Sequence, residues 1–224
     1  MNRVLWIGVV GIGWCGGCVP MTDAPPNTAS ARLRVVHASP DAPAVDVCVE
    51  GQVAFADAAF PGTTDYAELE AGTYAIRVTQ SGAGCGSAAV ISADLPLEAD
   101  EDVTVVALNE LSEIEPLVLI DDNTAPTSGN AKVRFVHAGP DAPTVDITLT
   151  DGTTLFDDVS FKEASDYLEV PAGTYDLQVR DETGANVVLA LDDVGLGAGR
   201  IYTVFAVGFL TGEPALDALV AEDN

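Results

Sequence analysis

The sequence contains few basic residues. Lys and Arg number nine against 35 Asp and Glu, which gives a formal net charge of −26 over 224 residues. Only Lys132 and Lys162 are lysines. Such a negative field repels phosphate backbones and anionic lipid headgroups, which argues against binding to nucleic acid or to a membrane surface. Two interpretations of the acidity stay open: a hydrated surface suited to saline surroundings, or a surface that collects cations such as calcium.

The sequence also lacks the short motifs of common enzymes and metal sites. It has no phosphate-binding glycine loop, no zinc-protease helix, no paired-cysteine motif after residue 18 and no calcium loop of spaced Asp and Asn ending in Glu. Histidine occurs only at His37 and His137, so histidine chemistry is confined to the surroundings of these two residues.

The first residues contain no apolar run long enough to cross a bilayer. Val4–Trp14 follows Arg3 and is too short to span about 30 Å as a helix, but is typical of an export signal. Two glycines before Cys18 resemble the small residues that precede the lipidated cysteine of bacterial lipoproteins. We predict an export signal over 1–18, lipidation at Cys18 and a polar tether over 19–31; ordinary cleavage nearby and an uncleaved anchor are the alternatives.

Cysteine is scarce, with four residues in all. If Cys15 leaves with the signal and Cys18 carries lipid, Cys48 and Cys85 form an even pair in a compartment that permits disulfides. A bridge between them closes a loop of about 37 residues and contributes about 3–4 kcal/mol by constraining the unfolded chain. The alternative is a two-cysteine metal site, for which no third ligand lies nearby in sequence. The corresponding position of the later repeat is Thr148.

An internal duplication organises the chain. Residues 32–79 align with 132–180 at about 22 of roughly 48 positions, with one extra residue near Asp151. Farther on, DVTVVALN (102–109) matches IYTVFAVG (201–208). We therefore predict two domains of about 90 residues each. Their expected bounds are 32–123 and 132–224, with a linker over 124–131.

Within each unit the apolar residues alternate with polar ones. Val45, Val47 and Val49 fall on one face of a strand, and Val145, Ile147 and Leu149 repeat the pattern. The expected strands of the first unit are 32–38, 44–50, 53–57, 64–69, 73–79, 88–94 and 102–108, with a possible extra one at 114–120. Short strands separated by Gly, Pro and Asp turns predict an all-β protein of two tandem immunoglobulin-like antiparallel β-sandwich domains.

The repeated segments resemble a known family. RVVHASPDAPAVDV (34–47) followed by DYAELEAGTYAIRV (65–78), and their second copies, are similar to domain of unknown function 4397. The resemblance implies an exported or surface-anchored bacterial or archaeal protein with tandem β-sandwich domains. It implies no particular reaction, ligand or catalytic residue.

The stretch VHASPDAPAVDV (36–47) and its copy VHAGPDAPTVDI (136–147) contain both histidines. One interpretation is a metal site or a His base oriented by Asp. The candidate ligands are His37, Asp41, Asp46, His137, Asp141 and Asp146. The other interpretation is a proline-bracketed arch between two strands, pinned by a hydrogen bond between His37 and Asp46. We favour the arch, because a feature that determines the fold must recur in every copy.

Two further kinds of site carry less weight. A Ser–His pair exists in the first copy alone, because Ser39 corresponds to Gly139. A carbohydrate platform is conceivable from tyrosines in both units, although strand aromatics more often belong to the core. These tyrosines are Tyr66, Tyr74, Tyr167 and Tyr175.

Taken together, the sequence predicts a non-enzymatic cell-surface or envelope module that binds or spaces a partner. We expect no catalytic residue and no cofactor. The expected partner is a protein or polysaccharide at the cell surface, not nucleic acid, and the membrane is reached only through the lipid on Cys18. The alternatives are a cation-dependent binding domain that uses the His/Asp arch, and an uncharacterised hydrolase.

Overall fold

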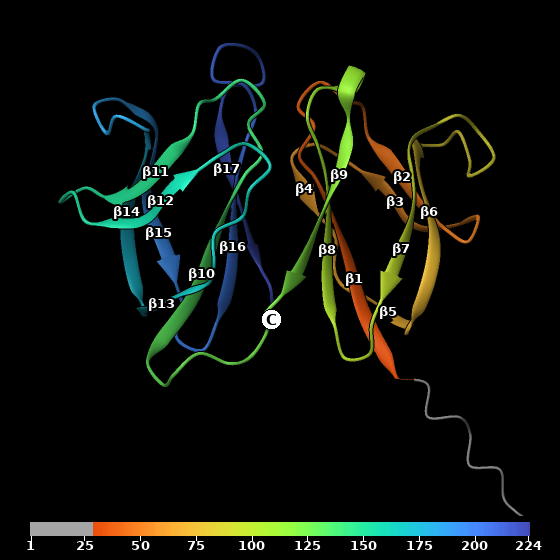
Figure 1. Ribbon diagram of the computed structural model, residues 1–224, viewed down its shortest axis with the longest axis horizontal. Coiled ribbons are helices and arrows are strands. Elements are labelled where there is room, and N and C mark those ends of the chain that lie inside the picture. Colours follow the sequence, from red (N-terminus) through yellow and green to blue (C-terminus); the bar gives the residue numbers. More distant parts are fainter. Residues whose placement is uncertain (1–28) are drawn as a thin grey trace, which may run out of the picture.

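The computed structural model describes residues 29–224, which form two β-sandwich domains side by side (Figure 1). The predicted export signal, Cys18 and the first part of the tether lie outside the described residues. Among the described residues, no helix has the length and apolar character needed to span a bilayer. The two domains repeat one architecture, and each is described by its two sheets.

The first domain is built from two packed sheets. One contains β1 (Ser30–His37), β4 (Gly62–Thr63), β5 (Ala67–Glu70), β8 (Asp102–Leu108) and β9 (Glu115–Asp121), in the order β4-β1-β8-β9 with β5 also paired to β1. The other contains β2 (Val45–Val49), β3 (Gln52–Ala58), β6 (Gly72–Gln80) and β7 (Ala89–Leu97), in the order β3-β2-β6-β7. A single 3₁₀ turn, Leu111–Glu113, precedes β9.

The second domain repeats this arrangement. Its inner sheet contains β10 (Asn130–His137), β13 (Leu168–Pro171), β16 (Ile201–Val207) and β17 (Asp217–Glu222), in the order β13-β10-β16-β17. Its outer sheet contains β11 (Val145–Leu149), β12 (Thr154–Val159), β14 (Gly173–Asp181) and β15 (Val187–Leu196), in the order β12-β11-β14-β15. The inner sheets of the two domains face each other (Figure 1).

The predicted fold class is confirmed. Most strand pairs are antiparallel, as expected, but β1 pairs with β8 and β10 pairs with β16 in parallel. The strand expected at 64–69 begins only at Ala67, and before it the Thr64 hydroxyl accepts a hydrogen bond from the Val35 N–H in place of a main-chain carbonyl. The possible extra strand is present as β9.

Cys48 and Cys85 form the predicted disulfide, with their Cα atoms 5.8 Å apart. Cys48 lies in the middle of β2, and Cys85 lies in the loop that follows β6. The bridge therefore ties a glycine-rich loop to the outer sheet of the first domain. In the second domain Thr148 occupies the matching place on β11, and its buried hydroxyl has no hydrogen-bond partner among the described residues.

The central strands of the inner sheets are buried on both faces. Leu33 and Val35 of β1 point into the core of the first domain, whereas the alternating Val36 and Ala38 belong to an apolar cluster shared with the second domain. The same holds for β10, β8 and β16, whose residues are nearly all buried. Strands β8 and β16 have nearly continuous apolar sequences because each separates two cores, whereas β1 and β10 also carry buried arginines.

An apolar cluster joins the domains. Its buried members are Val36, Ala38, Val106, Leu108, Leu119, Val136, Ala138, Phe205, Val207 and Ala221. Phe205 is fully buried against the first domain's strands. Burial of apolar surface contributes about 25 cal/mol per Å², so this contact holds the two sandwiches together as one packed body.

Two buried arginines cross this interface in opposite directions. Arg34 of the first domain donates from Nη2 to Asp223 Oδ1 at 2.6 Å, and Arg134 of the second pairs through Nη2 with Asp121 Oδ1. Arg34 is 1% exposed and Arg134 is 3% exposed. Each cation therefore finds its carboxylate on the other domain, as in a contact with approximate two-fold symmetry.

Threonines close these pairs into a ring. Arg34 Nε donates to Thr104 Oγ1 at 2.7 Å, and Thr104 Oγ1 donates to Asp121 Oδ2 at 2.5 Å. In the second domain the same bonds run from Arg134 Nε through Thr203 to Asp223, at 2.9 and 2.7 Å. The Arg–Asp ring consists of Arg34, Thr104, Asp121, Arg134, Thr203 and Asp223. The network satisfies buried charges that would otherwise destabilise the interface.

Tyrosines flank the ring in both domains. The guanidinium carbon of Arg34 lies 4.7 Å from the centre of the Tyr66 ring, and that of Arg134 lies 4.7 Å from the Tyr167 ring. Burial and the neighbouring Asp121 raise the pKa of Tyr66. Burial opposes the charge on Arg34, but the nearby Asp223 carboxylate raises the pKa of that guanidinium. Arg34 therefore stays charged and Tyr66 stays neutral, as this network requires.

Replacing one ring arginine should destabilise the whole chain. We expect Arg34→Ala to lower the free energy of unfolding by about 3–5 kcal/mol, because Asp223 is left buried without its cation. The matched control is Arg200→Ala, which removes an exposed pair with Glu222 and costs about 1 kcal/mol or less. Urea unfolding measures both. Equal losses in the two variants would contradict the structural role of the ring.

Candidate functional site

The histidine arch of the first domain is buried. His37 is 0% exposed; its Nε2 lies 3.1 Å from the Pro43 carbonyl oxygen, and its Nδ1 accepts a hydrogen bond from the Ser39 N–H at 3.4 Å. The edge of the imidazole packs against Phe60, with ring centroids 6.1 Å apart. Both nitrogens are thus used to hold the arch that joins β1 to β2.

The second arch repeats this geometry. His137 Nε2 lies 2.9 Å from the Pro143 carbonyl oxygen, its Nδ1 accepts from the Gly139 N–H at 3.3 Å, and Phe161 takes the place of Phe60. The carbonyl contact requires a proton on Nε2 and the N–H contact requires a lone pair on Nδ1, so the imidazole is neutral. Burial lowers the pKa of both histidines.

The expected hydrogen bond between His37 and Asp46 is not formed. Asp46 instead accepts hydrogen bonds from the N–H groups of Asp57 and Gly82, both at 2.9 Å. The reason is strand alternation: Val45 and Val47 face the core, so Asp46 projects from the opposite, outer face of its sheet, away from the buried imidazole. The arch is pinned by backbone partners of His37, not by Asp46.

The other candidate ligands are also separated. Asp41 Oδ1 accepts from the Leu111 N–H at 2.7 Å, and Asp141 accepts from the N–H groups of Leu210 and Thr211. These aspartates tie the arches to the loops that follow β8 and β16. The six predicted metal candidates therefore do not converge on one point in either domain.

The difference between Ser39 and Gly139 has a packing explanation. Ser39 is 0% exposed, and its hydroxyl has no hydrogen-bond partner among the described residues. At Gly139 an added Cβ would lie 3.0 Å from Leu216 Cδ1, tighter than ordinary van der Waals contact. The second domain thus leaves little room for a side chain where the first holds a buried serine.

The four candidate tyrosines are all engaged within the fold. Tyr66 donates to Asp121 at 2.5 Å and Tyr167 to Asp223 at 3.0 Å, so both belong to the surroundings of the Arg–Asp ring. Tyr74 and Tyr175 donate to main-chain carbonyls four residues earlier and pack against the cores of their domains. They tie strands together and do not form a joint exposed platform.

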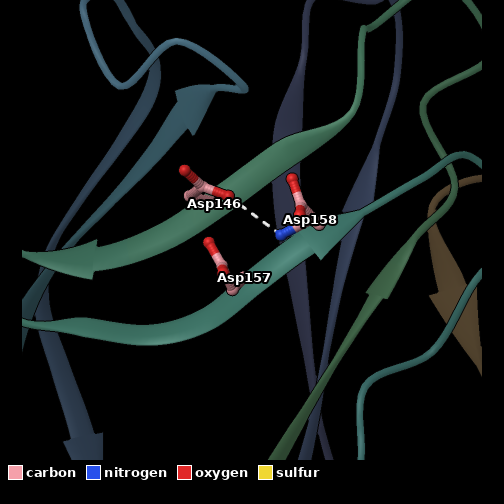
Figure 2. A group of neighbouring side chains, drawn as sticks. All are labelled: Asp146, Asp157 and Asp158. Atoms are coloured by element: carbon pink, nitrogen blue, oxygen red, sulfur yellow. Dashed lines mark hydrogen bonds between the residues drawn. The ribbon is translucent and has the colours of Figure 1, made fainter.

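Three carboxylates that the sequence analysis did not group together meet on the outer sheet of the second domain. Asp146 comes from β11, and Asp157 and Asp158 come from β12 (Figure 2). One oxygen from each lies within 4.8 Å of the others. Asp158 N–H donates to Asp146 Oδ1 at 2.9 Å. In the sequence, the adjacent residues Asp157 and Asp158 were the one visible sign of this cluster. Asp146 joins them only through the pairing of β11 with β12, which the sequence does not show.

The first domain has the same frame with one carboxylate fewer. Asp57 matches Asp158 and donates its N–H to Asp46, but Ala56 stands where the second domain has Asp157. Asp57 and Asp158 share a positive φ, 52° and 53°, at an irregularity in the strand register. The recurring aspartate of β2 and β11 therefore stabilises a bulge, and Asp157 is an addition to that frame.

The added carboxylate is electrostatically unfavourable. A hydrogen bond to Asp146, together with the negative charges of Asp146 and Asp158, raises the pKa of Asp157. Oxygen ligands of this kind suit a hard cation such as calcium, but a protein-bound calcium takes six to eight of them. The cluster supplies part of such a set, and nothing else in its described surroundings points to a bound ion.

The fold and the duplicated arches define a tandem β-sandwich protein. The chain belongs to the DUF4397 family, a domain of unknown function, whose model matches residues 31–148 and 140–224. No curated protein matches the chain. Among solved structures, it is similar to a family 26 carbohydrate-binding module of Amy13K from Eubacterium rectale, crystallised with maltoheptaose, at 8% identity over 86% of this chain and 97% of that one. The TM-score of 0.26 is too low for this likeness to bear on fold or ligand.

The buried histidines should make stability depend on pH between about 5 and 6.5. The unfolded chain takes up protons below about pH 6.5, whereas the folded histidines resist protonation because their pKa is lowered. The free energy of unfolding should therefore fall as the pH drops through this window. Urea unfolding from pH 8 to 5 measures it.

The control for this pH dependence is the double variant His37→Gln and His137→Gln, which cannot titrate. We expect a flatter profile between pH 5 and 6.5 in the double variant, and an intermediate one in either single variant. His37→Ala should lower the free energy of unfolding by about 1–3 kcal/mol at pH 8, since the arch carbonyl loses its donor. A double variant with the wild-type slope would show that other groups cause the dependence.

Repulsion within the carboxylate cluster predicts opposite effects on the melting temperature for two substitutions. Asp157→Asn should raise the melting temperature at neutral pH in chelator, because it removes one of three neighbouring negative charges. Ala56→Asp, which builds the same cluster in the first domain, should lower it. Differential scanning calorimetry measures both, and a repeat with calcium tests cation binding. A melting temperature that does not respond to either substitution would contradict the repulsion.

Proposed function

We propose that this protein is a non-enzymatic envelope module that presents two rigidly joined β-sandwich domains and binds or spaces a partner. The observation that carries the proposal is the use of the duplicated polar residues. In both copies the histidine, the arginine and the arch aspartates form hydrogen bonds or ion pairs within the fold. The histidines are also buried, and both of their ring nitrogens have hydrogen-bond partners.

The duplicated histidine is a poor candidate for a catalytic base. A general base must reach the proton it removes and must have a free lone pair near the substrate. His37 and His137 offer neither, because the lone pair of Nδ1 already accepts a main-chain hydrogen bond. This arrangement supports a binding or spacing role over a hydrolase.

The rigid contact between the domains supports a role in spacing. Ordinary domain contacts within one chain are polar and allow relative motion. Here an apolar cluster and the buried Arg–Asp ring fix one domain against the other. An ion pair between Lys162 and Glu115 adds a further contact at the edge of the interface. A rigid two-domain body holds whatever it binds at a set distance from its anchor.

The proposed address is the outside of the cytoplasmic membrane, through a lipid on Cys18. The Cys48–Cys85 disulfide supports an oxidising compartment. The strongly negative chain makes direct adsorption to anionic lipid unfavourable, so attachment depends on the acyl chains. A protein or polysaccharide of the cell surface is the proposed partner.

Cell fractionation tests this address and with it the function. We expect the wild-type chain in the membrane fraction, carrying radioactive palmitate, and Cys18→Ser without the label. Cys15→Ser is the matched control and should keep the label. Wild-type protein found unlabelled in the cytoplasm would overturn the envelope role.

A further inference from the structure

The first domain exposes an apolar edge strand. Among residues 29–224, strand β9 is the last strand of its sheet and pairs with β8 alone. Along it Val118 is 46% exposed and Ile120 is 56% exposed, with the exposed Pro116 before them. An exposed edge with alternate apolar residues is a ready template for another strand.

The free edge of β9 still offers main-chain hydrogen-bonding groups. The Ile120 carbonyl accepts a hydrogen bond from Arg134 Nη1 at 3.2 Å, which places the polar groups of Ile120 on the side away from β8. Because antiparallel residues alternate, Val118 and Pro116 face the same way. Proline has no N–H and fits that free row. Since Arg134 occupies the Ile120 carbonyl, the groups that remain on this row are the N–H and carbonyl of Val118 and the carbonyl of Pro116.

The two sheets of the first domain separate beside this edge. An apolar opening lies between β7 and β9, lined by Ile91, Leu95, Pro116 and Val118, and reaches Val35 and Val47 in the core. A strand added to β9 would place alternate side chains over this opening. Main-chain pairing and side-chain insertion therefore coincide at one place, as strand-addition sites require.

The second domain lacks an equivalent apolar row. Its edge strand β17 presents Ala218 and Val220, and then Glu222 at the position of Ile120. Glu222 is paired with Arg200 Nη1 at 2.6 Å. A charged pair of this kind protects an edge from pairing with another strand. The exposed apolar row is thus continuous on β9 and interrupted by a charged pair on β17.

We propose that the β9 edge binds an extended, basic segment of a partner protein by strand addition. Charge complementarity selects this occupant: Asp94 lies exposed at the rim of the opening, and its carboxylate has no hydrogen-bond or ion-pair partner among the described residues. A second copy of this chain is disfavoured, because two bodies of net charge −26 repel each other. This inference rests on the proposed binding role and names its site.

Binding of synthetic peptides to the purified full chain tests the proposal. The probe alternates valine with lysine and threonine; the controls are a scrambled peptide of the same composition and one with glutamate in place of lysine. We expect the probe to bind with a dissociation constant of about 100 μM, typical of a weak contact of small area. Both control peptides should bind at least tenfold more weakly. Fluorescence anisotropy of labelled peptides measures each affinity.

Variants locate the binding. Val118→Asp and Asp94→Lys should each weaken the probe at least tenfold, whereas Val220→Asp on the edge of the second domain should leave it unchanged. All three positions are exposed, and circular dichroism checks the fold. Equal binding of the scrambled peptide, or full binding by Val118→Asp, would overturn the proposal. So would a dimer in sedimentation that Val118→Asp dissolves, since it would make a second copy the occupant. If the peptide does not bind, the fractionation result for Cys18 is unaffected, so failure of this proposal can be distinguished from failure of the proposed function.

Discussion

Burial of two arginines between the domains is the constraint on which the rest of the structure depends. A guanidinium removed from water must find a carboxylate, and Arg34 finds one only on the second domain, as Arg134 does on the first. Thr104 and Thr203 then satisfy the remaining donors and acceptors. For these groups to meet, β1 and β10 must lie at the centre of their sheets and be buried on both faces. The parallel pairing of these strands with β8 and β16 provides that position.

The residues that recur in both copies and the residues that differ have separate roles. Recurring residues, such as the histidines and the bulge aspartates, form hydrogen bonds within the fold. Some differences lie at the surface: Ile120 against Glu222 on the edge strands, and Ala56 against Asp157 beside the bulge. Others are buried, as Ser39 and the disulfide-bonded Cys48 of the first domain are. The residues of the buried hydrogen-bond networks recur in both copies, whereas the exposed residues of the edge strands differ. Binding is therefore to be sought where the copies differ, and the β9 edge is the place where backbone, apolar side chains and charge agree.

Much of the fold follows from sequence patterns, and little of the site does. Alternation in Val45–Val49 and its copy located the core strands, because a strand with one face in the core repeats every two residues. The disulfide followed from the count of cysteines and the expected compartment. The prediction that His37 pairs with Asp46 was wrong. Strand alternation indicates the face of the sheet from which a side chain projects, but it does not indicate which neighbouring residue that side chain contacts. Asp121 and Asp223 have matching roles in the Arg–Asp ring, but both lie outside the segments that the sequence comparison aligned.

By itself the sequence determined that the chain is acidic, duplicated and all-β, since composition, repeat length and strand period are local properties of the chain. Only the tertiary structure decided how the two copies meet. Reciprocal ion pairs join Arg34 to Asp223 and Arg134 to Asp121, and the first of these spans 189 positions in the chain. No local pattern marks such a contact, because each residue alone looks like any polar residue on a strand. The pairing exists because two similar sheets pack face to face, and burial then requires each charge to find its partner across the interface.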